Sequence, residues 1–261
     1  PEERTQLESV IPATAPAKPK KARKLLVFDL NVGRFGHPSI PYANLAMQLI
    51  GAKTGAWEAT VSSDPAILHP ASLRQYDAVY LNNTIGDIFS NAEVRDAFAS
   101  YMANGGGLIG NHATTVTATD WKEFGNILGA RGASHRLTDE RVTVNVEDPA
   151  HPVTKAFGAG PFEYADEYFR FQAPWSRDKV RVLLSIDSRK TDMNQGRCYG
   201  QCYRDDNDYA VAWIQQYGKG RVFYTTLGHN PHVFQNKQML EFFTAGIQYA
   251  LGDLEADATP K

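Results

Sequence analysis

The stretch "GGGLIGNHATT", residues 105–115, places a histidine at the tip of a sharp turn. Three glycines lead into a short apolar run, and Asn111 and His112 follow it. In α/β enzymes with a strand-to-helix turn of this kind, a serine or cysteine nucleophile often stands where His112 stands here. The stretch therefore predicts a buried strand that ends in a functional turn, with an imidazole at the nucleophile's place.

Strands and helices alternate on both sides of this turn. The apolar runs of residues 24–30 and 76–83 are typical of buried parallel strands. Residues 39–55 and 91–107 have helical spacing and end in glycines. This alternation predicts an α/β fold, a doubly wound and mostly parallel sheet. After about residue 141, strands follow one another through loops, which predicts antiparallel extensions in the second half.

Polar residues stand where the predicted parallel strands end. In doubly wound sheets, ligands bind at the carboxyl ends of the strands. Asn83 follows one predicted strand, and Asn111 and His112 follow another. We therefore expect Asn83 and Asn111 to contact a substrate.

Three of the seven histidines follow predicted strands. His37 and His112 lie at the carboxyl ends of parallel strands, and His229 follows an apolar strand of undetermined direction. An imidazole can bind a metal or move a proton near neutral pH. His135 follows a helix and is a further candidate. Three histidines have a more ordinary interpretation: His69 and His232 as loop residues, and His151 as part of a structural turn or of a catalytic site.

The segment "YADEYFRF", residues 164–171, places two carboxylates among aromatic rings. Such carboxylates can bind a metal, can have a raised pKa, or can hold a sugar; a solvated strand edge is the alternative. Neighbouring side chains on a strand point to opposite faces, so one of Asp166 and Glu167 should face a given site. We expect Glu167 to be catalytic, and Asp166 and Tyr168 to bind substrate.

Composition and charge exclude several classes of protein. The chain has 261 residues and a formal net charge of -2, which gives no sign of a nucleic-acid partner. No apolar run approaches the roughly 20 residues that span a bilayer.

Residues 1–22 are rich in Pro, Ala and Lys, so we expect an extended arm without core contacts. Residues 23–254 form the predicted domain, and residues 255–261 a tail.

Several known chemistries lack their motifs. There is no G-x-S-x-G, no phosphate-binding loop and no dinucleotide fingerprint after the first strand, so no nucleotide cofactor is expected. Cys198 and Cys202 form either a small disulfide-closed loop or two free thiols. A disulfide would suit a periplasmic or secreted protein, which we favour over a cytoplasmic one.

The segments together resemble the ThuA family of trehalose-utilisation-like proteins. The matching stretches are "RFGHPSIP", "YDAVYLNNT", "GGGLIGNHATT", "DPAHPVTKAF", "ADEYFRF" and "GKGRVFYTTLGHN", in the family's order over about residues 24–252. The resemblance implies a flavodoxin-like, class I glutamine-amidotransferase-like fold without the cysteine nucleophile. It also implies a role in sugar catabolism beside oxidoreductases that make 3-keto sugars. The family's motif histidines match His37, His112, His135, His151 and His229, and its acidic pair matches Asp166-Glu167. The family turn usually has an apolar residue where Asn111 stands.

These observations support two main hypotheses. The first is a carbohydrate-active enzyme that cleaves or converts 3-keto-glycosides by proton abstraction and elimination. His112, His37 and Glu167 would be catalytic, and His37, His112 and His229 would bind a divalent metal such as zinc; His135 would contact substrate. The second is a non-catalytic sugar-binding or accessory protein. An amidotransferase-like hydrolase is a third hypothesis, against which the missing cysteine at the turn argues. The oligomeric state stays open, with a homo-oligomer among the options.

Overall fold

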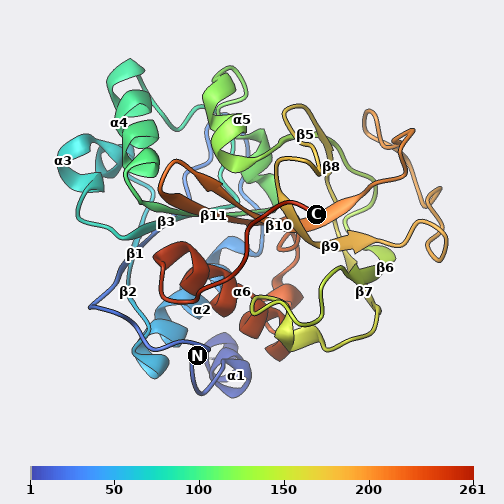
Figure 1. Ribbon diagram of the computed structural model, residues 1–261, viewed down its shortest axis with the longest axis horizontal. Helices are drawn as coiled ribbons and strands as arrows, with labels where there is room; N and C mark the ends of the chain where they lie inside the picture. The colour runs from blue at the N-terminus through green and yellow to red at the C-terminus, as the bar shows by residue number, and fades with distance from the viewer. Residues whose placement is uncertain (1) are drawn as a thin grey trace.

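The computed structural model describes residues 2–261 and centres on a nine-stranded sheet with the order β2-β1-β3-β4-β11-β10-β9-β6-β7 (Figure 1). Strands β5 and β8 form a separate pair. The strands are β1 (Lys24–Phe28), β2 (Glu58–Ser62), β3 (Ala78–Asn82), β4 (Gly107–Asn111), β5 (Arg131–Ser134), β6 (Glu140–Val146), β7 (Phe162–Asp166), β8 (Arg170–Gln172), β9 (Arg181–Ile186), β10 (Ala210–Tyr217) and β11 (Gly220–Thr225). The α-helices are α1 (Glu2–Val10), α2 (Ile40–Thr54), α3 (Pro70–Leu73), α4 (Ala92–Ala103), α5 (Lys122–Leu128) and α6 (Lys237–Leu251).

The first five strands of this order run parallel to one another. Leu25 pairs with Ala78, and Ala78 pairs in turn with Gly107, so β1, β3 and β4 are parallel neighbours as predicted. All residues of β3 and β4 are buried, because helices cover both faces of the sheet. From β11 onward the neighbours β10, β9, β6 and β7 pair antiparallel. The predicted fold class, with antiparallel extensions in the second half, is confirmed.

Helices cover the two faces of the sheet in separate groups. Figure 1 shows α3, α4 and α5 on one face and α1, α2 and α6 on the other. Two apolar clusters correspond to these faces: one includes Phe98 and Phe124, and the other includes Met47 and Phe243. The sheet therefore lies between two apolar cores. The ends of its strands remain available for a functional site.

Strand β11 joins the two halves of the sheet. It pairs parallel with β4 through Thr225 and Asn111, and antiparallel with β10 through Tyr224 and Trp213. Its carboxyl end therefore lies beside that of β4. The turn after β11 brings His229 to the same edge of the sheet as His112.

The N-terminal segment differs from its prediction. Residues 1–22 were expected to be extended and to contribute no core, but Glu2–Val10 form helix α1; Pro1 lies outside the described residues. Leu7 is fully buried and Ile11 nearly so, in the cluster that also contains residues of α2. Few residues of α1 are apolar, so α1 has little amphipathic pattern of its own. Its helical structure depends on packing against the surface of α2.

The segments at both ends of the predicted domain are held by hydrogen bonds. Ala17 exchanges two hydrogen bonds with the Gln248 side chain of α6, at 2.8 and 2.7 Å. The tail of residues 255–261 lies on the surface, where the Asp257 carbonyl is 3.1 Å from His151 Nε2. His151 therefore holds the tail, which favours its structural interpretation.

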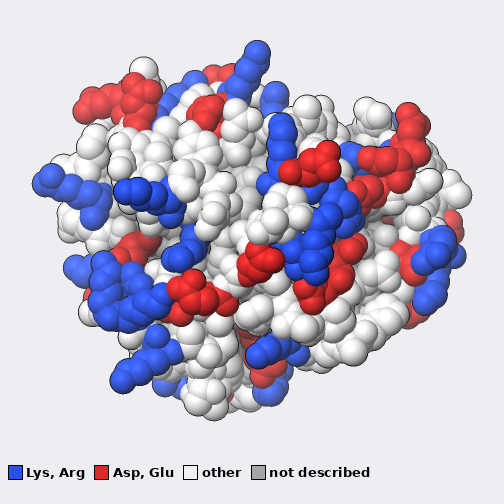
Figure 2. Space-filling model, in the orientation of Figure 1, with Lys and Arg blue, Asp and Glu red and all other residues white. Residues whose placement is uncertain are grey.

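No helix within residues 2–261 is both long enough and apolar enough to cross a membrane. Figure 2 shows basic and acidic side chains interspersed on one face of the molecule. This distribution agrees with the small net charge of -2.

Candidate functional site

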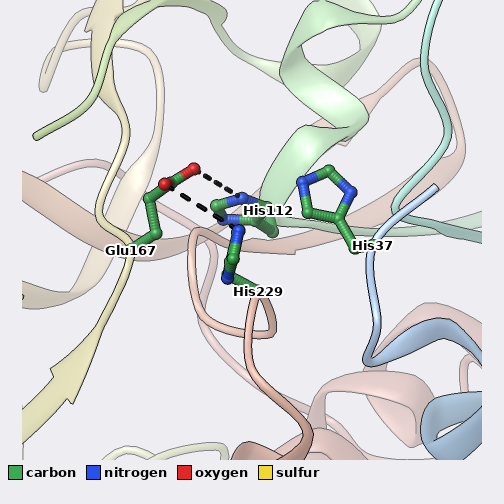
Figure 3. A group of neighbouring side chains, drawn as sticks. All are labelled: His37, His112, Glu167 and His229. Carbon is green, nitrogen blue, oxygen red and sulfur yellow. Dashed lines mark ion pairs between the residues drawn. The ribbon is translucent and has the colours of Figure 1, made fainter. Parts of the chain in front are cut away.

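Three histidines and one glutamate meet at the carboxyl edge of the sheet. His37 follows β1, His112 follows β4, His229 follows β11 and Glu167 follows β7. One ligand atom from each lies within 4.8 Å of the others (Figure 3). The three imidazole rings are 4.9 to 5.1 Å apart between centroids, each nearly perpendicular to the next. The predicted convergence of His37, His112 and His229 in one site is therefore seen.

The backbone of His112 is held in a conformation that is rare for a non-glycine residue. Its φ is +44°, in the left-handed region, at the point where β4 passes into a short 3₁₀ helix. The fully buried Tyr224 hydroxyl donates a 2.7 Å hydrogen bond to the His112 carbonyl. The turn thus aims the ring toward Glu167 and His229, as a nucleophile would be aimed at a substrate.

Hydrogen bonds define which ring nitrogen of each histidine faces the centre. His112 Nδ1 is 2.9 Å from the Thr226 carbonyl, an acceptor only, so Nδ1 carries the proton. In the neutral ring, His112 Nε2 is then the nitrogen with the lone pair, and it lies 3.3 Å from Glu167 Oε1. His229 Nδ1 lies 3.2 Å from Asn230 Oδ1, and its Nε2 lies 3.8 Å from Glu167 Oε2. An outer hydrogen bond of this kind orients histidines that bind metals.

Burial keeps two of these imidazoles neutral. Burial, followed by the neighbouring His112 and His229, lowers the pKa of His37 to about 3. Burial and then His112 also lower the pKa of His229. Both rings are therefore uncharged at neutral pH and keep a lone pair for a cation or a proton.

Glu167 carries the negative charge of the cluster. Burial alone would raise its pKa, but positive charge beside it, on the imidazoles of His112 and His135 when they are protonated, outweighs burial, so the pKa of Glu167 lies well below its usual range. His135 Nδ1 is 3.1 Å from Glu167 Oε2, and this contact raises the pKa of His135. An ionised carboxylate thus stands between a buried lone pair and a half-exposed imidazole.

A cleft of about 570 Å³ opens from this cluster to solvent. His37 and Glu167 line its inner part, and His135, Phe169 and Tyr199 line its wall. Because the cleft is polar at its base and partly aromatic at its side, it suits a small polar ligand with apolar faces.

The comparisons with known proteins agree with this architecture. The family model ThuA, described as trehalose utilisation, matches residues 24–250. The chain belongs to the ThuA family. That family is linked to trehalose utilisation in sugar metabolism.

Solved structures of ThuA-like proteins share the fold. One from Bacteroides uniformis is 23% identical with a TM-score of 0.73, and covers 90% of this chain and 94% of its own. One from Parabacteroides merdae is 18% identical with a TM-score of 0.66, and covers 91% and 93%. Among curated proteins, none matches the sequence. The predicted glutamine-amidotransferase-like fold is confirmed.

Two amides that the sequence assigned to substrate binding brace the ThuA turn instead. Asn83 and Asn111 are fully buried. Asn111 Oδ1 accepts a 3.0 Å hydrogen bond from the Asn83 backbone N–H, and Asn83 Nδ2 donates a 3.0 Å bond to the Gly228 carbonyl. These bonds join the ends of β3, β4 and β11, so the two amides hold together the strand ends that carry the site.

Asp166 and Tyr168 also lie away from the cleft. Asp166 is fully buried, where burial raises its pKa, and it accepts hydrogen bonds from the backbone N–H groups of Gly228 and Asn230 at 2.7 and 3.1 Å. Tyr168 is fully buried in the core. The adjacent carboxylates do point in opposite directions as expected: Glu167 into the site, and Asp166 to the turn that carries His229.

Sequence reasoning missed several residues of the site, among them Thr226 and Tyr199. The Thr226 carbonyl orients His112, and its hydroxyl accepts a 2.8 Å hydrogen bond from the Phe169 N–H. A backbone carbonyl leaves no signal in a sequence. Tyr199 lines the cleft from within the Cys198–Cys202 disulfide loop, and its place beside the two cysteines could have drawn attention to it.

Proposed function

We propose that the chain is a carbohydrate-active enzyme that cleaves 3-keto-glycosides by removing a proton beside the ketone. The supporting observation is a cluster of three histidines and Glu167, of which His37 and Glu167 line the cleft. A ketone at C3 makes the proton at C2 acidic, so a base of ordinary strength can remove it. This chemistry fits a family linked to sugar metabolism.

We propose further that His37, His112, His229 and Glu167 hold a divalent cation, zinc or similar. His112 Nε2 is buried without a hydrogen-bond partner, and its lone pair faces a carboxylate oxygen 3.3 Å away. Two such acceptors repel each other unless a positive charge lies between them. Four ligands at about 2.2 Å from one ion in a tetrahedron lie about 3.6 Å apart, so side chains whose ligand atoms lie within 4.8 Å of one another would draw together on binding. The residues fit the ion.

The chain's own groups divide the remaining work. The cation, when bound, supplies Lewis acidity at a carbonyl oxygen. His135, half-exposed and in contact with Glu167, lines the cleft outside the proposed cation site, so its imidazole can exchange a proton with a substrate. It takes the C2 proton as the C1–O bond breaks, and the C2–H electrons form the C1–C2 double bond. The leaving oxygen then receives that proton.

The proposal also covers the source of the substrate and the location of the protein in the cell. An oxidoreductase that makes 3-keto sugars would supply the substrate. We propose a periplasmic or secreted location, which the Cys198–Cys202 disulfide supports.

Elemental analysis of the purified protein, with NMR of a 3-keto disaccharide incubated with it, tests the proposal. We expect about one divalent cation per chain and release of a free sugar. His112→Ala should lose both, while His69→Ala, at a residue that does not line the cleft, should keep both. Sugar binding without metal or turnover would favour the non-catalytic alternative, and a metal-free protein that binds no sugar would contradict both.

A further inference from the structure

A five-residue disulfide loop forms part of the cleft wall. Cys198 and Cys202 are bonded, and the loop between them lies against the end of β5. The Tyr199 backbone N–H donates a 3.1 Å hydrogen bond to the His135 carbonyl, and the Ser134 hydroxyl donates a 2.5 Å bond to the Gln201 carbonyl. The loop is therefore fastened to the segment that carries His135.

Gly200 allows this close approach. Its φ is +143°, and a Cβ at this position would lie 3.0 Å from Ser134 Cβ and 3.2 Å from the Ala133 carbonyl oxygen. A side chain here would be strained and crowded against backbone. The loop thus combines a covalent closure with a glycine contact, and both restrict where Tyr199 can lie.

Tyr199 extends a chain of contacts from the base of the cleft to its rim. Glu167 contacts His135, and the Tyr199 ring stacks on the His135 ring with centroids 5.2 Å apart and planes 24° from parallel. Side-chain exposure rises outward along this chain, from 5% for Glu167 to 31% for His135, and Tyr199 as a residue is 57% exposed. An exposed aromatic ring held in place at the mouth of a polar cleft is suited to a ligand.

Arg197 also contacts the Tyr199 ring. Its guanidinium carbon lies 5.5 Å from the ring centre. Arg197 is exposed, so a ligand can displace this cation–π contact at small cost. The freed guanidinium has five N–H donors, which match the hydroxyl groups of a saccharide.

We propose that Tyr199 is a specificity-determining residue that stacks on the second ring of a saccharide. This inference rests on the proposed function, which places the reacting ring over the Glu167 cluster. The next ring outward then lies beyond His135, against Tyr199. Ligands with two rings should be bound through Tyr199, and ligands with one ring should not reach it.

Calorimetric titration of the full chain with trehalose and with methyl α-D-glucopyranoside tests the inference. Both lack the C3 ketone, so elimination does not occur during the measurement. Tyr199→Ala should weaken trehalose binding about tenfold and leave the one-ring ligand within about twofold. Tyr199→Phe keeps the ring and should bind both ligands like the natural chain. Cys198→Ser/Cys202→Ser, which releases the loop, should weaken trehalose binding about threefold.

Tyr203 provides the matched control. It follows the same loop, is 52% exposed and contacts Arg136, but it does not line the cleft. Tyr203→Ala should leave the binding of both sugars unchanged. Equal losses for both sugars in Tyr199→Ala, or no loss, would overturn the inference while 3-keto turnover stays intact. Turnover that fails while the two-ring preference persists would overturn the proposed chemistry alone. If the natural chain binds neither sugar, the inference is wrong.

Discussion

The parallel and antiparallel halves of the sheet build one site from different kinds of support. Strands β1, β4 and β11 of the parallel half end toward the site: His112 directly follows β4, and the loops after β1 and β11 carry His37 and His229. Glu167 directly follows β7, at the far edge of the antiparallel half, and the connection from β7 to β8 is held to Thr226 by the Phe169 N–H. The comparison teaches that the parallel half supplies the imidazoles and the antiparallel half supplies the carboxylate, which a braced connection holds in place.

The interiors of the two halves also differ in the contacts that hold them together. Residues of β3 and β4 are buried among apolar side chains. In the second half, Arg170 of β8 forms a two-pronged ion pair with Glu140 of β6, at 2.7 and 2.8 Å, and both side chains are almost fully buried. The segment that carries Glu167 is thus fixed by a buried charge pair.

The largest expected effect tests whether the two halves act as a unit. His112→Ala and Glu167→Gln should each lower the rate of 3-keto disaccharide cleavage by about 10³-fold or more. The double variant should lose little more, because groups that act together are not additive. Single-turnover assays with parallel metal analysis would measure this; additive losses would show that the halves contribute separately.

A second prediction concerns the support of the antiparallel half. Arg170→Met should lower the free energy of unfolding by about 3–5 kcal/mol, because Glu140 is left charged and buried without a partner. Urea denaturation is the measurement. Arg95→Met, whose ion pairs with Asp87 and Asp120 are more exposed, should cost less than about 1 kcal/mol. Similar losses in both variants would contradict the difference drawn between the halves.

A third, smaller effect belongs to the parallel half. Leu7→Ala in α1 should lower the free energy of unfolding by about 2 kcal/mol, since it leaves a cavity against the core beside α2. Glu8→Ala, an exposed neighbour on the same helix, should change it by less than about 0.5 kcal/mol. Thermal unfolding compares them. Equal stability of the two variants would restore the interpretation of residues 1–22 as an arm without core contacts.

The smallest effect is expected outside the site. His69→Ala should leave metal content and cleavage rate unchanged and shift the free energy of unfolding by less than about 0.5 kcal/mol. His69 lies in the loop before α3 and does not line the cleft. A loss of activity in this variant would show that the histidine effects are not confined to the strand ends.

The sequence predicted the parallel half better than the antiparallel half. Buried apolar runs with helices between them specify parallel strands, and polar residues after such runs specify the rim, so His37 and His112 could be placed. The position of β11 beside β4 depends on long-range pairing, which leaves no local pattern. His229 could therefore be placed after a strand, but the direction of that strand in the sheet could not be predicted.

The sequence also could not distinguish the roles of adjacent residues that have the same kind of side chain. Asp166 and Glu167 are adjacent carboxylates, and alternation along a strand predicted that one of them would face the site. Which one does so depends on the hydrogen bonds that Gly228 and Asn230 donate to Asp166. In the same way, Asn83 and Asn111 stand at the predicted rim but turn inward to brace it.

Strand β11 has a consequence for the synthesis of the protein. Gly220–Thr225 leave the ribosome after every other strand of the sheet, yet they occupy the space between β4 and β10. Until then, the nascent chain carries two unpaired strand edges in its interior, which are templates for wrong pairing. Translation that stops before residue 220 yields a polypeptide with both edges open and no His229. The site is thus completed among the last steps of folding, and truncated products are expected to need chaperones or degradation.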